Sequence, residues 1–142
     1  MTEIYTSSDT NLAIPDENTL LSTVSIADSG TILDLNVQLG ISHDRSNDLD
    51  VFLKAPDGTS VKLFASVGGN GNNLQDLTLD DDASHPISAA SNPNITTFRP
   101  EENLALFNGL SLSGVWTLEV RDTRKQKIGT LDRWSLEVKY LT

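Results

Sequence analysis

The residues best suited to chemistry in this 142-residue chain are aspartates that follow a loop rich in glycine and asparagine. The stretch GGNGNNLQDLTLDDDA, Gly68 to Ala83, ends in the consecutive residues Asp80, Asp81 and Asp82. Three adjacent carboxylates repel one another, and the chain already has a formal net charge of −10. A bound cation would offset this repulsion. Carboxylates, amides and backbone carbonyls form an oxygen-only ligand set of the kind that Ca²⁺ prefers.

A second acidic pair lies upstream, in the segment DLDVFLKA. Its apolar residues Leu49, Val51 and Leu53 alternate with Asp48, Asp50 and Phe52, so both aspartates fall on the solvent-facing side of a strand. Together with the glycine- and asparagine-rich loop, the two acidic segments favour a calcium site. A solvated acidic surface is the alternative, and the residues alone leave both open.

An EF-hand is excluded although DRSNDLDVFLKA alternates acidic and polar residues from Asp44. Leu49 occupies the position where the loop needs glycine, and Ala55 the position of the bidentate glutamate. The pattern therefore gives no helix–loop–helix calcium site.

Catalytic chemistry is not indicated. Ser42, His43 and Asp44 are adjacent, but neighbouring side chains of a strand point to opposite faces and cannot form a relay. The other histidine, His85, precedes a proline in a loop, and the chain has no cysteine and no GxSxG or HExxH motif. We predict that the chain is not itself an enzyme.

The elements that must position these residues are strands, because apolar residues recur with a period of two. In TILDLNVQLGIS, for example, Leu33, Leu35, Val37, Leu39 and Ile41 alternate with polar residues. The same alternation occurs in DLDVFLKA, SVKLFA (Val61, Leu63, Ala65), LTLD (Leu77, Leu79), VWTLEVR and RWSLEVKY. Turn sequences such as PDGT separate these runs, so we predict an all-β fold, an antiparallel β-sandwich of the jelly-roll type.

The strand positions of the two tryptophans bear on whether the chain is a carbohydrate-binding module. Trp116 shares its parity with Leu118 and Val120, and Trp134 shares its parity with Leu136 and Val138. Both indoles are therefore predicted to lie in the core and not on an exposed sugar-stacking platform.

Length and composition limit the classes of protein to which the chain can belong. The length fits one domain over residues 1–142, with residues 1–12 as an edge strand or a loose lead-in. No run approaches the roughly 20 apolar residues of a membrane helix, and the acidic balance disfavours nucleic acid and anionic lipid. The N-terminus lacks the features of a secretory signal, so we expect a cytoplasmic protein or a domain of a longer precursor.

Four blocks in this order resemble the P domain (P/Homo B domain) of the proprotein convertases, especially its bacterial versions. They are SHDRSNDLDVFLKAPDGTSVKLF, GGNGNNLQDLTLDDDA, FRPEENLALFNGLSLSGVWTLEVRDT and GTLDRWSLEVKY. The resemblance extends from about Ile14 to Tyr140.

The resemblance implies a jelly-roll module that follows a subtilisin-like catalytic domain in a secreted precursor, packs on it and supports its folding and stability. We accordingly expect an extracellular, monomeric domain whose partner is the adjacent protease or another domain of the same precursor. The resemblance assigns calcium ligands to Asp48, Asp50, Gly71, Asn72, Asn73, Asp80, Asp81 and Asp82. A calcium-dependent carbohydrate-binding or adhesive module remains the alternative.

Overall fold

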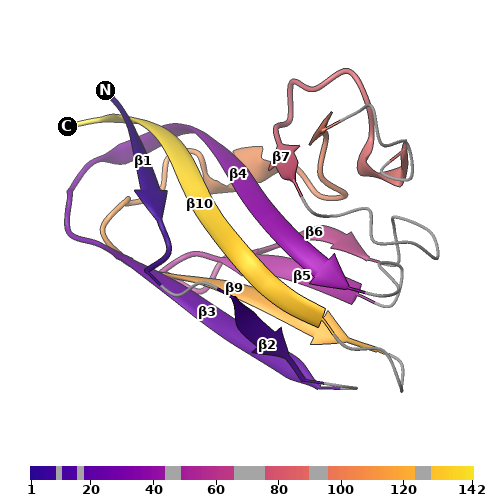
Figure 1. Ribbon diagram of the computed structural model, residues 1–142. Coiled ribbons are helices and arrows are strands. Elements are labelled where there is room, and N and C mark those ends of the chain that lie inside the picture. Colours follow the sequence, from indigo (N-terminus) through magenta and orange to yellow (C-terminus); the bar gives the residue numbers. More distant parts are fainter. Residues whose placement is uncertain (9–10, 16–17, 44–48, 66–75, 90–95, 124–128) are drawn as a thin grey trace.

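The computed structural model describes residues 1–8, 11–15, 18–43, 49–65, 76–89, 96–123 and 129–142, which form two packed sheets (Figure 1). The six-stranded sheet has the order β1-β10-β4-β7-β8, and β2 also pairs with β10. Its strands are β1 (Thr2–Thr6), β2 (Leu12–Ile14), β4 (Thr31–His43), β7 (Leu77–Leu79), β8 (Thr97–Phe98) and β10 (Gly129–Leu141). The four-stranded sheet has the order β3-β9-β5-β6, with β3 (Thr19–Ile26), β5 (Leu49–Lys54), β6 (Ser60–Ala65) and β9 (Gly114–Asp122).

All strand pairs are antiparallel except β7 and β8, which run parallel, so the predicted β-sandwich is confirmed. The described residues add only two short 3₁₀ helices, η2 (Ile87–Ala89) and η3 (Leu104–Phe107). No helix among them is long and apolar enough to cross a lipid bilayer.

The core lies between the two sheets and is built from the inward-facing residues of nearly every strand. Trp116 and Trp134 are 0% and 1% exposed, which confirms the prediction from parity. The Trp134 indole N–H of β10 donates to the Ser22 hydroxyl of β3 at 2.8 Å, so this hydrogen bond joins the two sheets inside the core.

Two core predictions were wrong by one residue, and a β-bulge explains each. Leu33 is 45% exposed, whereas its neighbour Ile32 is 1% exposed. Asp34 pairs with Lys139 and Ile32 with Tyr140, so Leu33 is an extra residue in β4 relative to β10. A bulge reverses the parity of the strand beyond it and turns Leu33 outward.

The second bulge lies in β6. Val51 pairs with Phe64 and Phe52 pairs with Lys62, so Leu63 is the extra residue. Phe64 is consequently fully buried beside Leu63, and Ala65, which alternation had placed in the core, is only half-buried.

Within the polar N-terminal segment, Thr2–Thr6 form an edge strand and not a loose lead-in. It pairs with β10, and the Tyr140 N–H donates to the Met1 carbonyl at 2.8 Å. The two ends of the chain consequently lie side by side at one end of the six-stranded sheet (Figure 1).

Candidate functional site

The structure describes half of the predicted calcium ligands. Asp50, Asp80, Asp81 and Asp82 are placed, whereas Asp48, Gly71, Asn72 and Asn73 lie outside the described residues. The site can therefore be built from its acidic residues on β5 and after β7.

The three consecutive aspartates form a turn directly after β7. The Asp80 N–H still donates to the Phe98 carbonyl of β8 at 2.9 Å, and the chain then leaves the sheet. The Asp80 carboxylate accepts the Asp82 N–H at 2.9 Å, and the Asp80 carbonyl accepts the Ala83 N–H at 3.0 Å. This Asx turn ends the strand and presents the side chains of Asp80 and Asp82 beside a surface hollow that Ser84, His85 and Thr97 also line.

Asp81 has a structural role that its sequence position does not reveal. One carboxylate oxygen accepts the Leu104 N–H at 2.8 Å, and the other accepts the Ala105 N–H, also at 2.8 Å. These N–H groups belong to the first turn of η3, where Asn103 makes no side-chain cap of its own. Asp81 therefore caps η3 across a separation of more than twenty residues, as a carboxylate at a helix N-terminus does.

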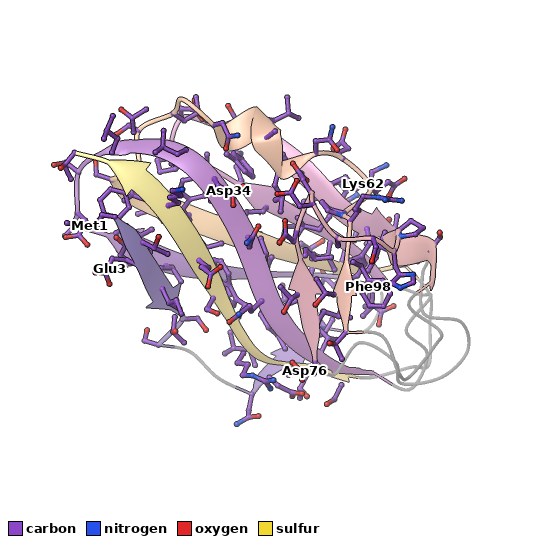
Figure 2. The ribbon with its side chains drawn as sticks, turned by 90° about the horizontal axis from the view of Figure 1, so that it is seen from above. Met1, Glu3, Asp34, Lys62, Asp76 and Phe98 are labelled. Carbon is purple, nitrogen blue, oxygen red and sulfur yellow. The ribbon has the colours of Figure 1, made fainter. Side chains whose placement is uncertain are left out.

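Asp34 joins the acidic triplet in space although it is far from it in the sequence. It lies on the outer face of β4, whose residue Val37 pairs with Leu79 just before the triplet (Figure 2). Burial and the like charges of Asp80, Asp82 and Asp81 raise the pKa of the Asp34 carboxyl above its ordinary value. Sequence alternation placed Asp34 on the solvent-facing side, but only the β4–β7 register shows what it faces.

Asp50 lies apart from this group. It is at the start of β5 in the four-stranded sheet and pairs with Arg121 of β9. β4 ends at His43, the last described residue before β5, whereas Asp80 lies beyond the Val37–Leu79 pair, toward the other end of β4. In the described part of the chain, no three acidic or histidine side chains are grouped so as to hold a metal ion.

Asp34 should destabilise the fold at neutral pH because its pKa is raised on folding. The folded state then binds this proton more tightly than the unfolded state, so stability is lost as the pH rises through the folded pKa. Asp34→Asn is therefore expected to raise the melting temperature at pH 7 in the presence of chelator. Thermal melts between pH 3 and 8 measure both effects.

Asp57→Asn is the matched control, because its expected effect on stability at pH 7 has the opposite sign. The Asp57 carboxylate accepts the Thr59 N–H at 2.9 Å in the turn between β5 and β6, and this bond lowers the pKa of Asp57. Its replacement should lower stability at pH 7. A lower melting temperature for Asp34→Asn would contradict the proposed repulsion.

No exposed aromatic platform for sugars is found among the described residues, which include every aromatic residue of the chain. Every tryptophan, tyrosine and phenylalanine is buried or half-buried. The half-buried Phe52 on the outer face of β5 is covered by the Arg121 guanidinium at 5.3 Å from the ring centre. The described residues therefore lack the exposed aromatic side chains that would favour the carbohydrate-binding alternative.

The serine beside His43 is engaged in the fold. The Ser42 hydroxyl donates to the Asp132 carboxylate at 2.6 Å, and the Thr130 hydroxyl donates to its other oxygen at 2.8 Å. Asp132 is the extra residue of a bulge in β10, so these bonds satisfy an irregular point of the sheet. The side chain of His43 lies outside the described residues, and His85 is exposed in a loop.

The fold and the acidic region define a β-sandwich module in which the candidate site is a surface group of carboxylates and the tryptophans belong to the core. The sequence model of the Proprotein convertase P-domain family matches residues 32–138, and the chain belongs to this family. Leupeptin-inactivating enzyme 1 of Streptomyces exfoliatus is 29% identical over 100 residues, which are 70% of this chain and 17% of that protein.

Two solved structures share the fold. The serine protease of Aeromonas sobria, solved with a chaperone, has a TM-score of 0.62 at 20% identity, and the match covers 100% of this chain and 27% of that one. FLHE has a TM-score of 0.58 at 10% identity, with 99% and 98% of the two chains covered. The chain thus spans well under a third of both the Streptomyces enzyme and the Aeromonas protease.

Proposed function

We propose that the chain is a non-catalytic accessory domain of a secreted subtilisin-like serine protease, and that it supports the folding and stability of the neighbouring catalytic domain. The observation that carries this proposal is the family match over residues 32–138, which includes strands of both sheets of the sandwich. The small share of the Streptomyces and Aeromonas proteins that the chain spans fits a module of a larger precursor. On this proposal the domain acts outside the cell.

The proposal is tested in the parent precursor by comparing Trp116→Ala with Val115→Ala. Trp116 is fully buried, so its loss should destabilise the domain, whereas Val115 is 49% exposed on the same strand. The first variant is expected to reduce the yield of folded, active protease and to lower its inactivation temperature, and the second to change neither. The isolated domain should hydrolyse no peptide or ester substrate. A precursor that yields fully active, equally stable protease with this domain deleted would contradict the proposal.

We further propose that the acidic regions bind one or more Ca²⁺ ions. The described ligands would be Asp50 at the start of β5 and Asp80, Asp81 and Asp82 after β7, with Asp34 as a further neighbour of the triplet. Oxygen ligands on irregular turns suit Ca²⁺, whose coordination geometry is flexible, better than Mg²⁺. Asp48, Gly71, Asn72 and Asn73 complete the proposed set from segments outside the described residues.

Calcium is expected to raise the melting temperature in a concentration-dependent way, because the ion would bind the folded state alone. The gain in the free energy of unfolding should reach about 2.7 kcal/mol at a hundredfold excess over the dissociation constant. Melts with calcium, with magnesium and with chelator at fixed ionic strength measure it. Three superimposable curves would contradict calcium binding, and equal effects of the two ions would indicate screening only.

A further inference from the structure

The exposed edges of the two sheets differ in how they are protected. The edge strand β6 is covered by the segment before η3, where the Glu101 and Glu102 N–H groups donate to the Leu63 and Lys62 carbonyls at 2.8 and 3.0 Å. The Glu102 carboxylate also accepts the Lys62 N–H at 2.6 Å. This edge of the four-stranded sheet is therefore already paired.

Both edges of the six-stranded sheet are also protected. β8 has two residues, and just beyond it Arg99 exchanges hydrogen bonds with His85 and Ile87 at 2.7 and 2.9 Å. β1 has only five residues and carries the exposed, charged Glu3, which pairs with Val138 of β10. Short edge strands and charged side chains on an edge strand are established ways to prevent pairing with another chain.

β3 has none of these protections. It is eight residues long, its sequence TLLSTVSI has no charge and no proline, and its register with β9 has no bulge. The Asp122 N–H donates to the Asn18 carbonyl at 2.9 Å, so the hydrogen-bonded pairs with β9 fall on even-numbered residues. The N–H and C=O groups of Leu21, Thr23 and Ser25 therefore point to the open edge, and the described residues offer them no partner.

We propose that this edge binds the same edge of a second copy of the chain, so that two four-stranded sheets join into one. The strands would run antiparallel about a two-fold axis at Thr23. Thr23 then pairs with the partner's Thr23, and Leu21 pairs with the partner's Ser25. This register satisfies all three exposed N–H and all three exposed C=O groups of each copy, with about six hydrogen bonds in total. The inference does not depend on the proposed function.

The β3 strand itself carries no charge that would oppose the same strand of a second copy. An uncharged strand meets an uncharged strand, and the nearest charges of the same face, Glu119 and Arg121 on β9, form an ion pair at 3.2 Å. The exposed side chain of Leu21 also lies beside a small residue, the partner's Ser25. Each copy carries a net charge of −10, so the remaining long-range interaction is repulsive and salt should strengthen the dimer. A basic peptide bound at this edge would instead be weakened by salt.

Sedimentation equilibrium of the purified chain is expected to show a reversible monomer–dimer equilibrium between about 10 μM and 1 mM, because the contact is small. Its dissociation constant should fall as sodium chloride is added. Hydrogen exchange should slow with protein concentration at the amides of Leu21, Thr23 and Ser25. The amides of Ser22 and Val24, which already bond to β9, should not change.

Thr23→Lys places two lysines against each other at the axis and should raise the dissociation constant at least about tenfold. Thr2→Lys is the matched control, because it makes the same charge change at an exposed residue of the short edge strand β1 in the other sheet. It should leave the dissociation constant within about twofold of the parent value. Thr23→Pro gives a second test, since the Thr23 N–H does not bond to β9 and proline should leave that ladder intact.

Three results would overturn the proposal. They are a single monomer mass at every concentration and salt, a dimer that Thr2→Lys disrupts and Thr23→Lys and Thr23→Pro do not, and an association that salt weakens. A dimer that is lost in Thr23→Pro, with the melting temperature of the monomer kept, would establish it.

Discussion

Trp116→Ala is expected to lower the free energy of unfolding by about 3–5 kcal/mol, the usual cost of truncating a large buried aromatic residue. The Trp116 side chain is 0% exposed. It packs edge-to-face on Phe107 of η3, with ring centres 5.2 Å apart and planes at 75°. Its indole N–H donates to the Leu112 carbonyl at 2.9 Å, so alanine leaves both a cavity and an unsatisfied buried carbonyl.

Urea unfolding of the isolated domain measures this loss, and Val115→Ala is its control. Val115 precedes Trp116 on β9 but points outward and is 49% exposed, so its truncation should change stability by less than about 0.5 kcal/mol. Similar losses in the two variants would contradict the assignment of Trp116 to the buried face of β9 and Val115 to its exposed face.

Local alternation was enough to predict the faces of most strands, because a strand buried on one side must repeat every second residue. It placed Trp116, Trp134, the alternating apolar residues of β5 (Leu49, Val51, Leu53) and those of β7 (Leu77, Leu79) in the core, where the structure has them. It misplaced Leu33 and Ala65 because a bulge depends on the partner strand: β10 determines the bulge in β4, and β5 the bulge in β6. A strand's own sequence does not specify the number of residues that oppose it.

The candidate site was harder to predict for a related reason. The sequence grouped Asp50 with Asp80, Asp81 and Asp82 by composition, whereas the β4–β7 register brings Asp34 to the triplet and leaves Asp50 in the other sheet. The contact of Asp81 with η3 joins residues that are far apart in the chain, and no short-range pattern announces it. Residue type predicted an acidic region, while strand pairing determined which carboxylates meet.

The hydrogen bonds of Asp81 change what a test of the acidic triplet should show. If repulsion were its only interaction, Asp81→Asn would be harmless without calcium because one like charge is removed. Both Asp81 oxygens accept backbone N–H groups of η3 at 2.8 Å, and an amide can replace only one of these acceptors. Asp81→Asn is therefore expected to lower the free energy of unfolding by about 2 kcal/mol, with or without calcium.

Asp82→Asn separates this structural role from metal binding. The exposed Asp82 carboxylate caps no helix among the described residues, and it is its N–H that bonds to Asp80. Without calcium this variant should be as stable as the parent or slightly more stable, because it relieves repulsion within the triplet. If Asp82 is a ligand, the variant should lose part of the stabilisation by calcium, whereas Asp81→Asn should lose stability in chelator as well. Equal stability of Asp81→Asn and the parent in chelator would contradict the capping role, because the two bonds to Leu104 and Ala105 exist without the ion.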